Sequence, residues 1–414
     1  LRDGIKEKLQ TDSFTWEELV AGFAKKQDPN FKFENQIIYD NISQLYNARS
    51  LTDLKSTQAP IEYMDAAEAS VALIAMDDLK LSQHPYTHVE IHPSLIYGVM
   101  GNQIVFPEHN PLPRDLFACG QGKQAVSLYH SNYQVRIDKT GVVLNNGQVP
   151  LVKSRYMKYI NKEEHPYGEN VIVAIMVYGG YNVEDSILFN EGSIERGLFR
   201  TTYLNSYEAY EESSNIGKSI TDSRFAKVEN ENVIRQKPGY DYSNLDEYGL
   251  IKPNTLLDDK KVLIGKVTSN VEDPDTVIDS SITPKKGQLG YVDKTFITEG
   301  ETGQRIAKVR IREERVPAIG DKFCSRCGQK GTIGLVIPEE DMPFTKSGLR
   351  PDIIVNPHAL PSRMTIGQII ETITGKLSTI TGQFGDGTGF NSKKSIEKIG
   401  DILEHYKFHR HGEE

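Results

Sequence analysis

Cysteine is scarce in this 414-residue chain, which holds only Cys119, Cys324 and Cys327. Three thiols exclude a disulfide-rich scaffold and favour a reducing compartment. Cys324 and Cys327 have the Cys-x-x-Cys spacing of half a zinc site, but no second pair stands at the spacing of a zinc finger. We therefore do not predict zinc in this chain and interpret both residues as unliganded thiols.

Long apolar runs are missing as well. No stretch resembles a membrane span or a signal peptide, so we expect an intracellular protein without membrane contact. The chain begins Leu-Arg-Asp-Gly without Met, and we expect it to be a segment of a longer protein. The formal net charge of −9 argues against a protein that coats DNA by itself, although it allows one wall of a charged cleft.

The chain is acidic overall but has one basic region. Between Arg305 and Lys330 there are eight Lys or Arg against three Asp or Glu. This region runs into the glycine-rich stretch 320–334, whose composition is poor for a strand or a helix and predicts a loop. Such a loop suits a phosphate or a nucleic-acid backbone, and the alternative is a surface loop with solvated lysines. Its candidate residues are Lys322, Arg326 and Lys330.

Three other cations lie in segments that we also expect to be rigid loops. Arg114 follows a proline-rich loop, and Lys123 with Gln124 follows in a short glycine-rich turn. Arg363 lies in a turn bounded by prolines. Arginine binds phosphate through a bidentate fork and lysine binds it as a point charge, so these loops suit a triphosphate. Solvated surface is the alternative for each residue.

The adjacent carboxylates Glu184 and Asp185 form a candidate metal site. They follow a Gly-Gly-Tyr-Asn turn, which itself follows a predicted buried strand at 171–177. Successive strand residues point to opposite faces, so the two can share one ion only where the backbone is irregular. Two carboxylates that leave room for water and phosphate oxygens suit Mg²⁺. An exposed acidic turn is the alternative.

Two capping boxes predict helices near the ends of the chain. Thr15 and Glu18 precede apolar residues and predict a short helix in the N-terminal region. Thr365 and Gln368 precede a longer apolar pattern with helical spacing, which predicts a core-facing helix that ends at Gly382.

Strands are the commoner prediction in the middle of the chain. They are expected at 261–267, 288–297, 306–311 and 352–356, with the second and third forming a hairpin. Residues 205–247 hold only seven Ile, Leu, Val, Phe or Met, so we expect a loop or an insertion outside the core.

Several short motifs occur in an order that is typical of one protein family. They include Gly-Lys-Gln-Ala (122–125), Gly-Tyr-Asn-x-Glu-Asp-Ser (180–186), Arg-Gly-Leu-Phe-Arg (196–200), Gly-Asp-Lys-Phe (320–323), Gly-Gln-Lys-Gly-Thr-Ile-Gly (328–334) and Asn-Pro-His-Ala-Leu-Pro-Ser-Arg-Met-Thr (356–365). Together they resemble the second-largest subunit of multisubunit DNA-directed RNA polymerases. The likeness runs from about Ile61 to the end and is closer to the archaeal and eukaryotic type than to the bacterial β subunit.

The resemblance implies a mixed α/β, β-rich fold. In it, a double-psi β-barrel hybrid-binding domain is interrupted by an inserted β module called the wall or flap. The implied domains are the tail of the external (lobe) domain at 1–74, the hybrid-binding domain at 75–200 and 316–400, the wall at 201–315 and the start of the anchor region at 401–414.

The resemblance also implies a role for each candidate cation. Lys322 and Lys330 would face the growing RNA 3′ end and the incoming nucleotide, while Arg114 and Arg363 would contact the triphosphate. The residues expected to contact the RNA–DNA hybrid or the nucleotide nearby are Lys123, Gln124 and Arg326.

Metal and partners follow from the same resemblance. Glu184 and Asp185 would help to hold the second, nucleotide-borne Mg²⁺, whereas the first ion would be held by the largest subunit. The partners implied are the largest subunit, the assembly subunits, the DNA template, the RNA transcript and nucleoside triphosphates. The triple-aspartate motif of the largest subunit does not occur in this sequence. We therefore expect polymerase activity only together with that subunit.

One departure and one alternative qualify the resemblance. Cys327 stands where the family usually has His, and a thiol offers no comparable proton donor near pH 7. The alternative function is a split or truncated subunit that serves as a non-catalytic assembly module. Large DNA viruses carry similar subunits, so the expected location is the nucleus or cytoplasm, or a virion or cytoplasmic factory if the source is viral.

Overall fold

The computed structural model describes residues 65–76, 84–160, 162–216, 219–230, 233–270, 273–391 and 396–414. The helix expected at Thr15 lies outside these residues, as does most of the segment assigned to the lobe domain. The chain divides into two compact units, Leu1–Pro93 and Ser94–Glu414. None of the helices in the described ranges combines the length and apolar character needed to cross a membrane.

The described part of the first unit is small. Helix α6 (Ala66–Val71) begins after Asp65, whose side chain accepts a hydrogen bond from the backbone N–H of Glu68. Strands β1 (Ile74–Ala75) and β2 (His88–Val89) pair in parallel. No predicted site residue lies in this part of the chain.

The second unit contains a five-stranded mixed sheet that carries the candidate residues. Its strand order is β15 (Lys322–Cys324), β16 (Lys330–Ile337), β6 (Ser186–Asn190), β17 (Ile353–Val355) and β5 (Val173–Ile175). β16 pairs in parallel with β6, and β5 pairs in parallel with β17. Leu188 and Phe189 of β6 are fully buried in two different apolar clusters, so the middle of this sheet is covered on both faces.

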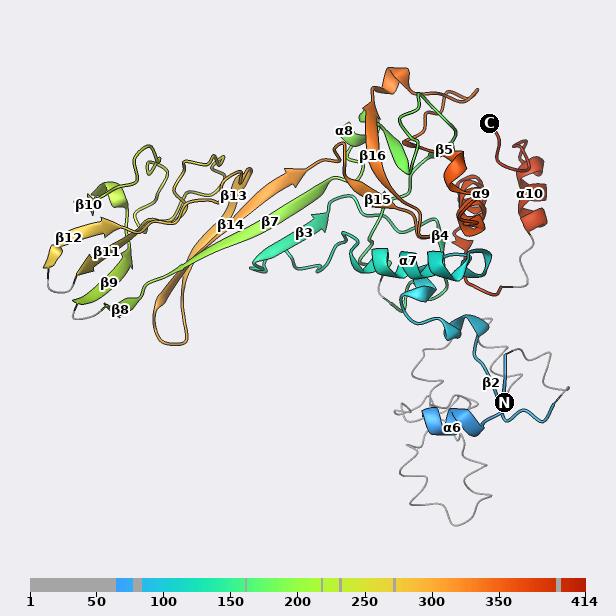
Figure 1. Cartoon of the computed structure of the whole chain (residues 1–414), viewed down its shortest axis with the longest axis horizontal. Helices are drawn as coiled ribbons and strands as arrows, with labels where there is room; N and C mark the ends of the chain where they lie inside the picture. Colours follow the sequence, from blue (N-terminus) through green and yellow to red (C-terminus); the bar gives the residue numbers. More distant parts are fainter. Residues whose placement is uncertain are drawn as a thin grey trace, which may run out of the picture. The chain divides into compact units, whose positions relative to one another are not determined.

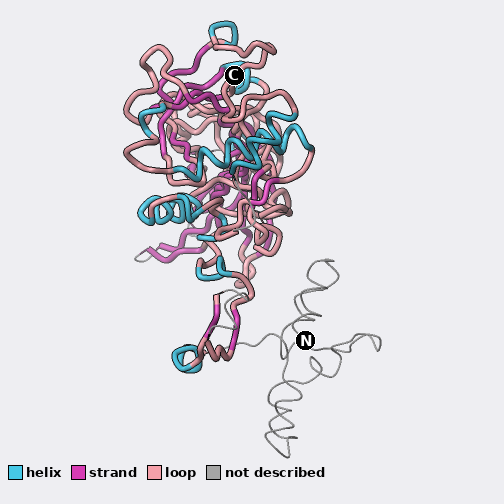
Figure 2. The backbone as a smooth tube through the Cα atoms, turned by 90° about the vertical axis from the view of Figure 1, so that its right-hand side faces the viewer, coloured by secondary structure: helices cyan, strands magenta, loops and turns pink. Residues whose placement is uncertain are grey.

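The second unit also contains helices. The longer ones are α7 (Leu112–Lys123), α9 (Ile366–Thr381) and α10 (Ile396–His405), and α10 lies beside α9 (Figure 1). The shorter ones are α8 (Glu191–Glu195), η2 (Pro93–Ile96), η3 (Gly101–Gln103), η4 (Pro107–His109), η5 (Val228–Asn230), η6 (Glu339–Asp341) and η7 (Pro357–Ala359). Long connecting loops run between these elements (Figure 2).

A second strand-rich part projects from the same unit on two long strands (Figure 1). One antiparallel sheet has the order β13 (Tyr291–Glu299), β14 (Arg305–Arg315), β7 (Thr201–Tyr210) and β3 (Thr140–Leu144). The other has the order β10 (Val233–Ile234), β12 (Asp273–Asp279), β11 (Lys266–Asn270), β9 (Ser219–Phe225) and β8 (Ser213–Ile216). A separate pair joins β4 (Val152–Lys153) to β18 (Gly385–Asp386).

Our expectation that 205–247 lies outside the core is wrong. Phe225, Val228 and Leu245 are buried in the apolar core of the second strand-rich part, together with Val309 and Ile311 of β14. The segment is poor in apolar residues because side chains alternate between the two faces of a strand, so a few of them suffice to cover one face. The hairpin predicted from 288–297 and 306–311 is confirmed as β13 and β14.

The stretch 320–334 is a β-hairpin rather than the loop that its composition predicted. β15 and β16 pair in antiparallel register, with Lys322 opposite Thr332. Two glycines allow β16 to approach its neighbours closely. A Cβ at Gly331 would collide with the carbonyl of Asp185, and one at Gly334 would collide with the carbonyl of Tyr181. These glycines therefore serve strand packing and do not indicate a flexible loop.

Three more local predictions need correction. Arg114 and Lys123 lie in α7 and not in loops, because the prolines open the helix at its first turn. The strand at 171–177 is an edge strand, and Ile175 is 37 % exposed, since β5 has only β17 beside it. The helix to Gly382 is confirmed as α9, but the side chain of Thr365 makes no capping hydrogen bond.

Candidate functional site

The candidate site begins at a strained turn before β6. Glu184 and Asp185 both have positive φ, at 52° and 70°, which side chains other than glycine rarely adopt. The backbone N–H of Thr332 in β16 donates to the Asp185 carbonyl at 3.2 Å. The irregular backbone predicted for the two carboxylates is therefore confirmed, and it places Asp185 beside the β15–β16 hairpin.

Arg363 reaches Asp185 from the turn that precedes α9. Its Nη2 donates to Asp185 Oδ2 at 2.5 Å, and its Nη1 donates to Gln329 Oε1 at 2.8 Å. The Arg363 side chain is 21 % exposed and that of Asp185 is 34 % exposed. The ion pair is thus partly buried but open to a ligand from one side.

Gln329 links the β15–β16 hairpin to the segment 359–365 and is a residue that sequence reasoning missed. Besides accepting from Arg363, its Nε2 donates to the Thr365 hydroxyl at 2.6 Å and to the Ala359 carbonyl at 3.1 Å. The Thr365 hydroxyl therefore serves Gln329 instead of capping α9. In the sequence, only its place between Gly328 and Lys330 points to Gln329 as a site residue. Its amide side chain is uncharged, so it adds nothing to the pattern of charged residues.

Helix α7 adds Arg114 to this group. Arg114 Nη1 donates to the Gly328 carbonyl at 3.3 Å, and its guanidinium lies 5.3 Å from the centre of the Phe117 ring. Lys330 Nζ lies 5.7 Å from the same ring. Phe117 is thus an exposed aromatic surface between two cations, each in the range of a cation–π interaction.

The electrostatics of the group are those of an anion-binding site with one internal carboxylate. The hydrogen bond from Arg363 lowers the pKa of Asp185, burial opposes this, and the charges of Arg363, Arg114 and Lys330 lower it further. Burial and the nearby charge of Arg363 lower the pKa of Arg114, while Asp185 raises it. These mutual effects show that the three cations act on a common space around Asp185.

Other predicted residues lie outside this hydrogen-bonded group. Lys322, Lys123, Gln124 and Glu184 are exposed. Arg326 is instead directed inward, where it forms a 2.6 Å ion pair with Glu371 of α9. Cys327 is fully buried beside the same carboxylate, with Sγ 3.9 Å from Glu371 Oε2, whereas Cys324 is exposed.

The oxygen donors of this group supply only part of the ligand shell of a metal ion. The described residues contain no group of three or more His, Cys, Asp or Glu side chains arranged to hold one. Glu184 and Asp185 offer two adjacent carboxylates, and one oxygen of Asp185 already accepts from Arg363. This set fits an ion that brings most of its ligands with it, as Mg²⁺ on a nucleotide does, and it does not fit a resident protein-bound metal.

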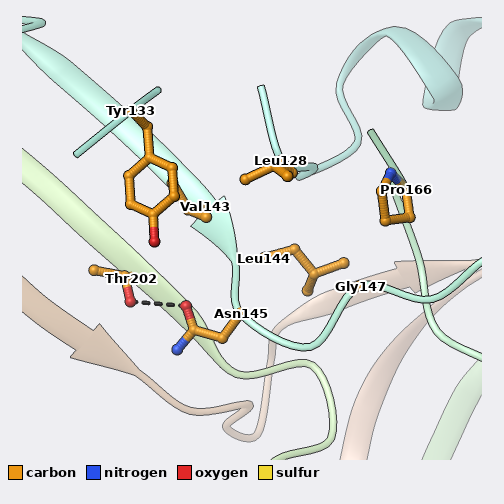
Figure 3. Close-up of a pocket in the computed structure, with 8 residues that line it drawn as sticks. All are labelled: Leu128, Tyr133, Val143, Leu144, Asn145, Gly147, Pro166 and Thr202. Atoms are coloured by element: carbon orange, nitrogen blue, oxygen red, sulfur yellow. Dashed lines mark hydrogen bonds between the residues drawn. The ribbon is translucent and has the colours of Figure 1, made fainter. Parts of the chain in front are cut away.

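An open cavity lies elsewhere in the second unit. It has a volume of about 350 Å³ and is lined by residues of β3, β7 and three loops, among them Tyr133, Val143 and Pro166 (Figure 3). At its rim the Thr202 hydroxyl donates to Asn145 Oδ1 at 2.8 Å. No predicted site residue lines it.

The comparisons with known proteins agree with the motifs. Residues 100–414 match the family described as RNA polymerase Rpb2, domain 6. The chain is 40 % identical over 393 residues to DNA-directed RNA polymerase II subunit RPB2 of Encephalitozoon cuniculi, covering 91 % of this chain and 34 % of that protein. It is 42 % identical over 363 residues to DNA-directed RNA polymerase II subunit 2 of Arabidopsis thaliana, covering 82 % of this chain and 30 % of that protein.

An archaeal relative extends this likeness. The chain is 39 % identical over 379 residues to DNA-directed RNA polymerase subunit Rpo2 of Sulfolobus acidocaldarius, covering 88 % of this chain and 33 % of that protein. The chain therefore belongs to the family of second-largest subunits of multisubunit DNA-directed RNA polymerases, as its motifs predicted. It spans about a third of the length of these relatives.

Proposed function

We propose that this chain forms the nucleotide-binding side of a DNA-directed RNA polymerase active site. The observation that carries the proposal is the group formed by Arg114, Lys330 and Arg363 around Asp185. Two arginines held by hydrogen bonds and an exposed lysine, with a carboxylate among them, suit a polyphosphate that carries a divalent cation. The family to which the chain belongs supports this use of the group.

The proposed reaction is nucleotidyl transfer with two metal ions. The 3′ hydroxyl of the RNA attacks the α-phosphorus of the nucleotide in line, and pyrophosphate leaves. Arg114 and Arg363 neutralise charge that develops on the leaving phosphates, and Lys330 contributes to the same field. Mg²⁺, when bound, supplies further charge compensation, and Glu184 with Asp185 would provide oxygen ligands to the second ion.

The exposed residues around this group suit contacts with nucleic acid. Lys322 on β15 and Lys123 with Gln124 at the end of α7 are open to solvent. We assign Lys322 to the RNA 3′ end and the other two to the RNA–DNA hybrid. Arg326 forms an ion pair with Glu371 of α9. We therefore assign it to holding the β15–β16 hairpin against α9 and not to direct contact with nucleic acid.

The proposed architecture is a double-psi β-barrel interrupted by a wall module. The mixed sheet of β15, β16, β6, β17 and β5 supports the barrel, and the separate apolar core within 201–315 supports the wall. The limits of the domains at 1–74, 75–200, 201–315, 316–400 and 401–414 stay predictions. The proposed partners are the largest subunit, which would hold the first Mg²⁺, the assembly subunits, the DNA template, the RNA transcript and nucleoside triphosphates.

An intracellular location goes with this function. It would be the nucleus or the cytoplasm for a cellular source, and a virion or a cytoplasmic factory for a viral one.

A non-catalytic assembly module is the second candidate, and exposed apolar side chains favour it. Leu112 and Leu116 on α7 are 67 % and 63 % exposed, and Ile175 on the edge strand β5 is also exposed. Such side chains are typical of surfaces that meet other subunits. This candidate predicts that the cation group is dispensable for RNA synthesis.

Replacement of Arg363 tests the proposed function. In the native assembly that contains this chain, we expect Arg363→Ala to lower nucleotide incorporation by about 100-fold or more, the range known for a lost transition-state donor. Binding of an RNA–DNA hybrid should change much less, because Arg363 is directed to the triphosphate. The matched control is Arg305→Ala in β14. Arg305 also forms an ion pair, with Glu211, but it does not belong to the cation group.

Equal losses of incorporation and hybrid binding in Arg363→Ala would contradict the assignment. Unchanged incorporation would favour the assembly module.

A further inference from the structure

The open cavity of Figure 3 lies outside the cation group and differs from it in chemical character. None of the described residues that line it is charged. Phosphates and carboxylates are usually bound by cations, and ammonium groups by carboxylates, so this lining suits a neutral group. Its volume of about 350 Å³ falls at the lower end of the range of small-molecule sites.

The lining is divided into a polar side and an apolar side (Figure 3). The polar side is formed by Tyr133, Asn145 and Thr202, and the apolar side by Leu128, Leu144 and Pro166. The Thr202 hydroxyl donates to Asn145 Oδ1 at 2.8 Å, which fixes the orientation of the amide. No described residue forms a hydrogen bond with the Tyr133 hydroxyl, so that hydroxyl can bind a ligand.

Hydrogen bonds from neighbouring segments hold the walls of the cavity in place. The backbone N–H of Asn145 donates to the Arg200 carbonyl at 3.0 Å. The buried Arg310 of β14 donates to the backbone carbonyls of Tyr133 and Gln134, at 3.1 Å and 2.8 Å, so the loop that carries Tyr133 is fixed as well. The cavity is therefore preformed, and a ligand does not have to order it on binding.

A ligand has to match both sides of the cavity. A purely apolar group would leave the polar side without hydrogen-bond partners once water is displaced, which is unfavourable. A nucleobase has a hydrogen-bonding edge and two apolar faces, and such a face can stack on an aromatic ring like that of Tyr133. The choice of a nucleobase rests on the proposed function, which brings nucleic acid to this chain.

We infer that this cavity binds an unpaired nucleobase, with hydrogen bonds to Tyr133 and Asn145 and apolar contacts with Leu144 and Pro166. Because the cavity is open, the sugar of the nucleoside can remain in solvent. The site is separate from the cation group, and it requires neither a triphosphate nor a metal ion.

The base can belong to a free nucleoside or to a single strand, and Arg200 distinguishes the two sources. Arg200 forms an ion pair with Glu314 at 3.2 Å, and Glu314 lies opposite Thr202 in the register of β14 and β7. A cation therefore lies near the polar side of the cavity, where it can bind a phosphate of a strand. Arg200→Ala should weaken binding of a strand and leave binding of a nucleoside unchanged.

Saturation-transfer NMR tests the inference in the native assembly that contains this chain. The probe is uridine, without Mg²⁺ and without a template. We expect Tyr133→Phe and Asn145→Ala each to weaken uridine binding by about threefold to tenfold, the range for one lost hydrogen bond. Tyr133→Phe keeps the aromatic ring, and Arg310 contacts only the backbone of this residue, so this variant should fold normally.

The matched control is Tyr248→Phe, which removes a hydroxyl from a side chain that is 65 % exposed and does not line the cavity. It should leave uridine binding unchanged. Single-stranded oligouridine is then added as a competitor. If the cavity takes the base of a strand, oligouridine should displace uridine at a lower concentration than unlabelled uridine does, and Arg200→Ala should remove this advantage. If the base comes from a free nucleoside, the two competitors should be equal per base.

The possible failures are distinguishable. Unchanged uridine binding in both Tyr133→Phe and Asn145→Ala, or an equal loss in Tyr248→Phe, would overturn the inference. The proposed function would still stand, because it depends on the effect of Arg363→Ala on nucleotide incorporation. Conversely, undiminished incorporation by Arg363→Ala would count against the proposed function, whereas uridine binding that depends on Tyr133 and Asn145 would keep the cavity as a nucleobase site.

Discussion

At the scale of single residues, the site depends on contacts that sequence spacing does not encode. Arg363 and Asp185 are 178 positions apart, and each was assigned to a ligand before the structure showed that they bind each other. The turn at Glu184 could be predicted because its glycines and its charges are local. Gln329 could not, because an amide has no distinctive pattern and its three partners lie 30 to 36 positions further along the chain, in the segment 359–365.

A buried carboxyl group beneath the site gives a prediction about pH. Asp115 of α7 is 7 % exposed, and its Oδ1 accepts from Asn110 Nδ2 at 3.4 Å. Burial raises its pKa to about 6, the hydrogen bond from Asn110 lowers it, and the charge of Glu108 raises it. Tyr97 and Cys119 also lie in the field of this carboxylate.

The sign of the pH effect follows from proton uptake. Between about pH 4 and pH 6 the folded chain keeps a proton on Asp115 that the unfolded chain has lost, so the free energy of unfolding decreases as the pH rises. The pKa shift of Asp115 sets an upper limit of about 3 kcal/mol on this change in the free energy of unfolding. Screening by solvent reduces the expected change to about 1 kcal/mol.

Asp115→Asn should remove this contribution. The measurement is urea unfolding of the unmodified protein and of the variant at pH 4.5 and pH 7. The free energy of unfolding should decrease less between these pH values in the variant. An equal decrease in both chains would contradict the assignment to Asp115.

At the scale of elements, the spacing of apolar residues correctly predicted those helices and strands whose apolar pattern is regular. Helix α9 and the β13–β14 hairpin were predicted because their apolar residues repeat with the period of a helix or a strand. The stretch 320–334 was mispredicted because its glycines were interpreted as a sign of a loop. In the structure, Gly331 and Gly334 allow β16 to lie close to its neighbours. The segment 205–247 was mispredicted because a few apolar residues, among them Phe225, Val228 and Leu245, are enough to join the core that β14 also lines.

Gly331 provides the sharpest test at this scale. An added Cβ would lie 2.5 Å from the Asp185 carbonyl oxygen and 2.7 Å from the Ile187 side chain. We expect Gly331→Ala to lower the free energy of unfolding by about 1–3 kcal/mol, as overpacking does, and to weaken triphosphate binding because Asp185 has to move.

The control for this change is Gly120→Ala in α7, where nothing lies within 4 Å of an added Cβ. Because alanine is favoured over glycine inside a helix, this control should keep or slightly raise stability. Denaturant unfolding of both variants would decide, and equal stability of the two would contradict the packing argument.

At the scale of the whole molecule, charge and completeness determine what the chain can do. The chain has a net charge of −9, but its stretch 305–330 holds eight Lys or Arg against three Asp or Glu, so its attraction for polyanions is local. It spans about a third of the length of its relatives. It brings two carboxylates to the site, Glu184 and Asp185. We therefore propose that it contributes one side of an active site whose other side comes from the largest subunit.

The most direct measurement is Mg²⁺-dependent extension of an RNA primer on a DNA template. It compares the isolated chain with the assembly that co-purifies with it, and that assembly with one that carries Glu184→Ala and Asp185→Ala together. We predict extension by the assembly alone, and its loss in the double variant. Extension by the isolated chain, or undiminished extension by the double variant, would contradict the account.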